Sequence, residues 1–227
     1  MKNDDLFIYP TDTVWGIGCS LYSEKGQERI SEIKRSAKNK PLSIMFANTE
    51  ILHASFSFPK EVTLTWLQDF FKLETTLGFP LARAKIKIPK WATGESSFVS
   101  VRCLENKIIS EIYNEITTPF FSTSLNLTGE HPITQEMEAR KFQEIYAPDA
   151  HFVNSKRALD LSGSSSTIIF LNENLNFEIY AGEQVAITGR SGSGKSTLLG
   201  ILATLDQASA GKLMVCKESI VELNEEQ

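Results

Sequence analysis

A glycine-rich segment near the C-terminal end, Gly189–Ser196, constrains the fold of this chain more than any other feature of its sequence. The segment follows the phosphate-binding pattern G-x-x-x-x-G-K-[ST]. An apolar run, Val185–Thr188, precedes it, and apolar residues at helical spacing follow it within Leu198–Leu205. Because this pattern requires a strand before the loop and a helix after it, the sequence predicts a strand–loop–helix unit whose backbone N–H groups close on phosphates.

The residues of this loop expected to bind phosphate are glycines, a lysine and two hydroxyl residues: Gly189, Gly192, Gly194, Lys195, Ser196 and Thr197. Only 31 residues, 197 to 227, follow Ser196. Phosphoryl transfer to water also needs a second anchor for Mg²⁺ and a positioned water molecule. The remaining sequence supplies neither, so we expect a vestigial nucleotide site that does not hydrolyse ATP.

Composition excludes several classes of protein. The net charge is −5 at pH 7, which gives no overall attraction to nucleic acid or to an anionic membrane. Cys19, Cys103 and Cys216 have no metal-ligand spacing, so we expect no protein-held metal and a reducing, cytoplasmic environment. The polar N-terminus and the lack of a long apolar run argue against a signal peptide and against membrane insertion.

The first 171 residues alternate between strand-like and helix-like patterns, which is typical of an α/β domain. The predicted strands are 6–9, 42–47, 84–88, 98–103, 119–124 and 167–171. The predicted helices are 24–35, 62–71, 106–116 and 134–146, with Ser23 and Thr134 as N-caps. The character of the sequence changes at the polar patch Asn172–Asn176, so we expect two domains, 1–172 and 173–227.

Four polar segments of the first domain carry side chains suited to small anionic or polar ligands. They are Tyr9–Cys19, Lys34–Leu42, Ser100–Arg102 and Phe121–Gly129. The first and last are rich in hydroxyls, the second holds four cations in seven residues, and the third places its serine and arginine on one strand face. Each also has an ordinary structural interpretation, as a strand-to-turn connection, a solvated helix end or a capped turn.

Together and in this order, the four segments resemble the YrdC/TsaC (YciO/YwlC) family, the threonylcarbamoyl-AMP synthases. Members read roughly P-T-D-T-V-Y-G-L-G, K-x-R-P…K-P-L, V-x-V-R and T-S-A-N-x-S-G, and end on a strand that begins S-T, as Ser166-Thr167 does here. The resemblance covers about residues 6–171. It implies a twisted mixed α/β sheet with helices around a concave, basic cavity.

The resemblance also implies a reaction. L-threonine, bicarbonate and ATP, with Mg²⁺, would give threonylcarbamoyl-AMP and pyrophosphate for the t⁶A modification of tRNA, together with other proteins of that pathway. Lys34 and Arg102 are implied as catalytic residues, and Thr11 and Thr13 as contacts of threonine. The residues implied for ATP are Lys38, Lys40, Ser100, Thr123, Ser124 and Asn126. Ser36-Ala37 stands where the family has Arg-Pro, so one arginine used at the phosphates is missing from its register.

Residues 174–227 resemble the start of an ABC-transporter ATPase domain, from the strand and glycine-rich loop to the later turn Ala208–Leu213. The later catalytic motifs of that family do not follow, which argues against an ABC ATPase subunit. Two interpretations of the first domain stay open. One is the synthase, and the other is a non-catalytic module for tRNA or double-stranded RNA. Its phosphate contacts would be Lys34, Arg35, Lys38, Lys40, Arg83, Lys85 and Lys87, the last three on one predicted strand face.

Overall fold

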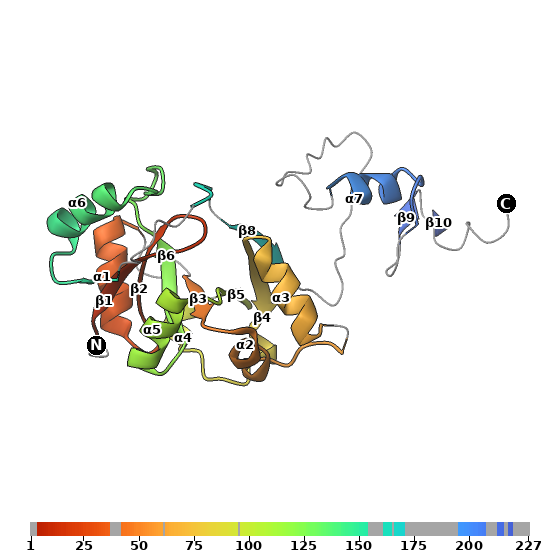
Figure 1. The fold of residues 1–227 in the computed structure, drawn as a ribbon. Helices are drawn as coiled ribbons and strands as arrows, with labels where there is room; N and C mark the ends of the chain where they lie inside the picture. Colours follow the sequence, from red (N-terminus) through yellow and green to blue (C-terminus); the bar gives the residue numbers. More distant parts are fainter. Residues whose placement is uncertain are drawn as a thin grey trace. The chain divides into compact units, whose positions relative to one another are not determined.

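The computed structural model describes residues 4–36, 42–60, 62–94, 96–153, 161–164, 166–170, 195–207, 213–215 and 218–219. The pattern of contacts between Cα atoms divides the chain into two compact units, Met1–Leu175 and Asn176–Gln227. The first unit contains the large sheet (Figure 1). Within the described ranges, no helix is long and apolar enough to cross a membrane.

Unit 1 is built on a mixed eight-stranded sheet with the strand order β7-β1-β2-β6-β3-β5-β4-β8. Its strands are β1 Leu6–Pro10, β2 Trp15–Ser20, β3 Ser43–Phe46, β4 Thr75–Pro80, β5 Phe98–Cys103, β6 Phe120–Ser124, β7 His151–Phe152 and β8 Thr167–Phe170. The pairs β1–β7, β3–β5 and β4–β8 are parallel, and the other neighbours are antiparallel. The prediction of a mixed α/β sheet is confirmed.

The helices of unit 1 are α1 Glu24–Lys34, α2 Thr49–Ser55, α3 Leu64–Lys72, α4 Lys90–Thr93, α5 Lys107–Ile116 and α6 Glu136–Tyr146, with a 3₁₀ turn η1 at Leu81–Arg83. The N-cap predicted for α1 is confirmed, because Ser23 Oγ accepts a hydrogen bond from the backbone N–H of Gly26 at 2.9 Å. The cap predicted for α6 is wrong. That helix begins after Gln135, which makes no side-chain capping bond, and Thr134 lies one residue outside.

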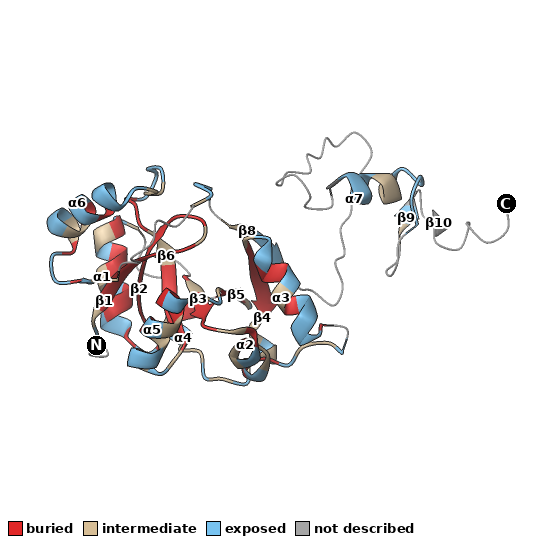
Figure 2. Ribbon diagram, viewed as in Figure 1, coloured by how far each residue is buried: buried red, intermediate tan, exposed pale blue. Residues whose placement is uncertain are grey.

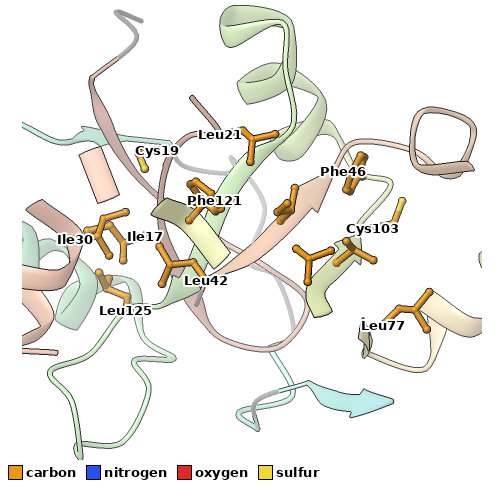
Figure 3. Close-up of a cluster of buried hydrophobic side chains, with 14 of the residues drawn as sticks. Ile17, Cys19, Leu21, Ile30, Leu42, Phe46, Leu77, Cys103, Phe121 and Leu125 are labelled. Atoms are coloured by element: carbon orange, nitrogen blue, oxygen red, sulfur yellow. The ribbon is translucent and has the colours of Figure 1, made fainter. Parts of the chain in front are cut away.

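The two faces of the sheet carry separate hydrophobic clusters, because successive strand residues point to opposite sides. The larger cluster collects Ile8, Ile17, Ile44, Val101 and Phe121 together with buried residues of α1, α3 and α6. Figure 3 shows part of this cluster, including Ile17 and Phe121 of the sheet and Ile30 of α1. The smaller cluster collects Phe7, Tyr9, Met45 and Phe120 under Ile108, Ile109 and Ile112 of α5. The central strands are therefore buried on both sides, as Figure 2 shows.

Strand β2 was not predicted, since its two glycines resemble a loop. It pairs with β1 in antiparallel register, Phe7 opposite Gly18 and Tyr9 opposite Gly16. A Cβ at Gly18 would lie 2.5 Å from the Phe121 carbonyl oxygen and 2.6 Å from a ring carbon of Phe7. The glycines therefore make room for aromatic rings on the face covered by α5, and neither has a positive φ.

Replacing Gly18 by alanine is expected to lower the free energy of unfolding by about 1–3 kcal/mol, because the new methyl meets backbone as well as a buried ring. Gly16→Ala serves as the comparison, since its Cβ would meet only the Tyr9 ring tip and the Thr123 carbonyl at 3.2 Å or more. Urea unfolding measures both. Equal stability of Gly18→Ala and the parent protein would contradict this account of the β2 glycines.

The strand predicted at 84–88 is wrong. The segment follows η1 and makes a single antiparallel bridge, between Ala84 and Phe56. Its alternation has a different cause: Ile86 and Ile88 pack against the larger cluster, while Lys85 and Lys87 are exposed. An extended surface segment that buries every second side chain produces the same pattern as a strand without entering a sheet.

Unit 2 contains the helix α7 Lys195–Leu202 and two short strands, β9 Met214–Val215 and β10 Glu218–Ser219. The helix predicted after the glycine-rich loop is confirmed, and Ser196 and Thr197 are exposed at its start. The predicted strand Val185–Thr188 and the glycines Gly189, Gly192 and Gly194 lie outside the described residues.

Candidate functional site

A cavity of about 200 Å³ opens on the sheet face that α5 partly covers. Most of its lining residues lie outside the apolar cluster packed under α5. Its lining is rich in hydroxyl groups from five strands and loops: Thr11, Thr13, Ser43, Thr76, Ser122, Thr123, Ser124 and Ser166. Arg102 of β5 is the cation among the described lining residues. One sheet face thus holds an apolar half under α5 and a polar half that is open to a ligand.

The loop between β1 and β2 fixes the direction of its hydroxyl groups. Thr11 Oγ1 donates to the Val14 carbonyl at 2.7 Å, so the Thr11 proton is used. The 3.0 Å contact between the Thr11 and Thr13 hydroxyls is therefore donated by Thr13. Arg102 Nη1 donates to Thr13 Oγ1 at 3.0 Å. Since a hydroxyl has one proton and two lone pairs, Thr13 has one lone pair left, with which it can accept a hydrogen bond from a ligand.

Arg102 is itself oriented by this loop. Its Nη2 donates to Asp12 Oδ1, so two guanidinium nitrogens are bound to adjacent residues of one loop. Only 9% of its side chain is exposed, which makes the guanidinium a desolvated cation with a defined direction. The arrangement can hold a carboxylate or a phosphate at the cavity wall.

Lys34 lies at the end of α1 and holds the loop that follows β6. Its Nζ donates to the Ser124 carbonyl, to the Asn126 carbonyl at 2.9 Å and to Asn126 Oδ1 at 2.8 Å. An ammonium group has three N–H donors, and each has an acceptor here. Lys34 is 95% buried, with 5% of its surface exposed. In this arrangement it orders the loop and leaves no donor for a phosphate.

Asn126 is engaged in the same way. Its Oδ1 accepts from Lys34 and from the Ser124 hydroxyl, and its Nδ2 donates to the carbonyls of Leu127 and Glu130. Its amide therefore has both protons and its oxygen in use. Ser124 differs, because its hydroxyl donates to Asn126 Oδ1 at 2.7 Å and lies on the cavity wall. Its two oxygen lone pairs can therefore accept hydrogen bonds from a ligand. Of the two, Ser124 is the residue that can contact a ligand directly.

The remaining predicted ligand contacts can now be compared with the cavity lining. Thr11, Thr13, Arg102, Thr123 and Ser124 line the cavity together. Ser100 lies on the same face of β5 as Arg102, as predicted, but outside the described lining. Lys38 and Lys40 lie outside the described residues.

Sequence reasoning missed several lining residues, namely Ser43, Thr76, Ser122 and Ser166. Thr76 and Ser166 bring their hydroxyls within 2.7 Å of each other where β8 joins β4. Ser122 and Ser166 belong to segments that were recognised as motifs, but nothing in the sequence around Ser43 or Thr76 marks them. Only the strand order places them beside Arg102.

Two ionisable groups near the site stay protonated at neutral pH. Burial raises the pKa of the Tyr9 phenol well above its ordinary value, despite its hydrogen bond with Ser122. Burial also raises the pKa of the Cys103 thiol, with Glu105 and Glu50 adding to the shift. Neither group is suited to act as a base or a nucleophile at neutral pH.

Comparison with known protein families identifies the family to which this chain belongs. A family model described as "Telomere recombination", which covers Sua5, YciO and YrdC, matches residues 1–179. The chain belongs to this family. A model of ABC transporters matches residues 172–227, in agreement with the resemblance of the second segment.

Curated members of the Sua5/YciO/YrdC family include enzymes. The threonylcarbamoyl-AMP synthase of Enterobacter sp. (strain 638) is 31% identical over 140 residues, which are 61% of this chain and 72% of that enzyme. The enzyme of the same name from Yersinia pestis (strain Pestoides F) is 28% identical over 142 residues, 62% of this chain and 73% of the enzyme.

Solved structures of family members share the fold. The H234A/Y235A variant of P. abyssi Sua5 is 25% identical with a TM-score of 0.59, over 75% of this chain and 50% of that chain. This chain therefore spans about half the length of that Sua5. E. coli YciO is 20% identical with a TM-score of 0.58, over 75% of this chain and 80% of that chain. P. abyssi Sua5 has also been solved in complex with L-threonine, at 24% identity and a TM-score of 0.60, over 74% of this chain and 47% of that one.

Proposed function

We propose that unit 1 is a threonylcarbamoyl-AMP synthase, which converts L-threonine, bicarbonate and ATP to threonylcarbamoyl-AMP and pyrophosphate. The observation that carries the proposal is the convergence of Thr13, Arg102 and Ser124 in one cavity. These residues come from three segments far apart in the chain, and each segment matches a motif of the family. Curated relatives that bear this name support the assignment.

Threonine fits the polar chemistry of this cavity. A volume of about 200 Å³ is below the roughly 300–1,000 Å³ of pockets for drug-sized ligands and suits an amino acid. The guanidinium of Arg102 would bind the carboxylate, and the free lone pair of Thr13 would accept an N–H from the amine. Both contacts leave the amine nitrogen positioned for bond formation.

The reaction needs two bonds to form in sequence. The ammonium of bound L-threonine first releases a proton to solvent. The amine nitrogen then bonds to the carbon of bicarbonate, and the bicarbonate hydroxyl leaves with a second amine proton as water, giving a carbamate. A carbamate oxygen then attacks the α-phosphorus of ATP, the bond to the bridging oxygen breaks, and pyrophosphate leaves with the electron pair. Thr13, Arg102 and Ser124 would contribute orientation and charge compensation, and Tyr9 and Cys103, which stay protonated, would not act as bases.

The nucleotide would lie against β6, with Ser124 and Thr123 as direct contacts. Lys34 and Asn126 act on it through the loop that they hold, and are positioning residues in this proposal. We assign Lys38 and Lys40 to the triphosphate on the family pattern alone. Mg²⁺ would enter bound to the phosphates of ATP, since this ion is usually held by substrate phosphates and water rather than by an all-protein site. Among the described residues, no group of three metal-ligating side chains occurs.

A synthesis assay tests the proposal. Purified protein incubated with ATP, L-threonine and labelled bicarbonate is expected to release pyrophosphate in a threonine-dependent manner and to form a labelled adenylate. Omission of threonine is the control. Folded protein that releases no pyrophosphate under these conditions would show that the unit is not a synthase. We further propose that the product feeds t⁶A modification of tRNA in the cytoplasm.

The glycine-rich loop of unit 2 is expected to be dispensable for this reaction. Lys195→Ala removes the ammonium group that would contact phosphates in an ATPase, and it should leave threonine-dependent pyrophosphate release within twofold of the parent protein. The same assay measures it. A large loss would mean that the two units cooperate, contrary to the proposal.

A second candidate function is binding of double-stranded RNA or tRNA without catalysis. The observation in its favour is a set of exposed cations, Lys85 and Lys87 on the extended segment after η1 and Lys90 at the start of α4. Phosphate contacts of this kind make affinity fall steeply with salt. Salt-sensitive RNA binding by a protein that fails the synthesis assay would select this alternative.

A further inference from the structure

Arg102 and Asp12 form an ion pair and belong to the walls of two different cavities. The first is the hydroxyl-lined cavity described above, and the second is a cavity of about 350 Å³ lined by Asp12, Thr49, Gln68, Phe71, Lys72, Cys103, Leu104 and Glu105. Arg102 belongs to the wall of the first cavity and Asp12 to the wall of the second. Their ion pair therefore links a residue on the wall of the first cavity to a residue on the wall of the second.

The pair balances the charge of the first cavity. The other described polar groups on its lining are uncharged hydroxyls, so Arg102 alone would give the site a net positive charge. Asp12 supplies the opposite charge in direct contact with the guanidinium. Only 9% of the Arg102 side chain and 28% of the Asp12 side chain are exposed, so solvent screens the two charges less than it would at the surface.

The position of Asp12 does not depend on its carboxylate alone. Its backbone carbonyl accepts a hydrogen bond from Ser162 N at 3.1 Å, and the Thr13 carbonyl accepts one from Gly163 N at 2.9 Å. Thr11 closes the same loop through its hydroxyl bond to the Val14 carbonyl. A substitution that changes only the charge of residue 12 is therefore expected to keep the loop in place.

We propose that Asp12 is a specificity-determining residue, whose charge makes the cavity select amino-acid zwitterions over the corresponding acids that lack an amine. This inference rests on the proposed function, because it takes the carboxylate of L-threonine to be the partner of Arg102. In a cavity with balanced charge, a zwitterion gains its carboxylate contact and keeps a favourable field for its ammonium. A plain carboxylate brings an uncompensated negative charge near Asp12.

The test compares two ligands with one carbon skeleton. 3-Hydroxybutyrate is threonine without its amine, and both are titrated calorimetrically into the full-length protein without ATP. Asp12→Asn keeps the acceptor oxygen and removes the charge, so the ratio of 3-hydroxybutyrate affinity to L-threonine affinity is expected to rise about tenfold. An unchanged ratio in folded Asp12→Asn protein would overturn the proposal, because a purely structural role would weaken both ligands alike.

Two control variants make the outcome specific. Asp149→Asn removes the same charge from another arginine–aspartate pair, Arg29–Asp149 at 2.6 Å on the surface, and should leave the ratio unchanged. Asp12→Glu keeps the charge and moves it by one methylene, so its ratio should stay within about twofold of the parent. If Asp12→Asn does not fold, a tenfold shift of the ratio in Asp12→Glu would still refute a role for the charge, and an unchanged ratio would support it.

Failure of this inference and failure of the proposed function give different results. If the protein forms threonylcarbamoyl-AMP but Asp12→Asn leaves the ligand ratio unchanged, the assignment of Asp12 alone is wrong. If no adenylate forms but the ratio shifts as expected, the cavity selects zwitterions for another purpose. The ligand titrations require no turnover, so they remain informative in both cases.

Discussion

Replacing Lys34 by alanine is expected to lower the free energy of unfolding by about 3–5 kcal/mol and to abolish ligand binding at the loop after β6. The reason is the use of its three donors on Ser124 and Asn126, in an environment that leaves 5% of the residue exposed. Truncation leaves these acceptors without their donor, and the bonds to the Asn126 carbonyl and to Asn126 Oδ1 are buried. The loop that carries the Ser124 hydroxyl then loses its attachment to α1.

Urea unfolding and the synthesis assay measure the two parts of this prediction. Lys107→Ala is the matched control, because that lysine is 88% exposed and 3.7 Å from Glu111, and its loss should change neither stability nor activity measurably. Lys34→Met keeps the length of the side chain without its charge and should be nearly as unstable as Lys34→Ala. Parent-like stability of Lys34→Met with weakened ATP binding alone would instead identify Lys34 as a direct phosphate contact.

Local patterns predicted the helices that cover the sheet. The helices α1, α3 and α5 agree with the predicted ranges to within two residues, because their apolar spacing and the cap of α1 at Ser23 are local signals. The N-cap predicted at Thr134 is wrong by one residue, because α6 has Gln135 at that position. The exact end of a helix depends on backbone geometry, which cannot be predicted from the presence of a cap-forming residue alone.

Strands were harder to predict where glycine or a surface position altered the pattern. Gly16 and Gly18 made β2 look like a loop, although they lie in a strand to accommodate the Tyr9 and Phe7 rings. The alternating segment 84–88 looked like a strand but lies along the surface. Gly16 and Gly18 face rings of the neighbouring strand β1, and the bridge of Ala84 goes to Phe56, so in both cases the pairing, and not the residue pattern, decides the structure.

The resemblance located the site, but not the use of each side chain within it. Lys34 and Asn126 belong to recognised motifs, yet their hydrogen bonds go to the protein itself. Asp12 stood inside a motif without an assigned role, and its pairing with Arg102 depends on the meeting of the β1–β2 loop with β5. A sequence shows which donors and acceptors exist, and only the fold shows which of them are still available.

Replacing Arg102 by alanine is expected to lower kcat/KM for threonylcarbamoyl-AMP synthesis by about 100- to 1,000-fold. Arg102 is the cation on the described cavity lining, and its Nη1 and Nη2 are held by Thr13 and Asp12. Loss of the guanidinium removes the carboxylate contact and leaves Asp12 facing the substrate without a counter-charge. KM for L-threonine should therefore rise more than KM for ATP.

Arg102→Lys separates the effect of charge from the effect of geometry. Lysine keeps the positive charge, but it lacks the planar fork that bonds Asp12, Thr13 and a carboxylate at once, so kcat/KM should still fall by about 10- to 100-fold. Arg29→Ala removes a partly exposed arginine from its pair with Asp149 and should leave activity within twofold. Circular dichroism confirms that each variant is folded. Folded Arg102→Ala protein with parent-like kinetics for threonine would place the carboxylate elsewhere, and would remove the basis for assigning specificity to Asp12.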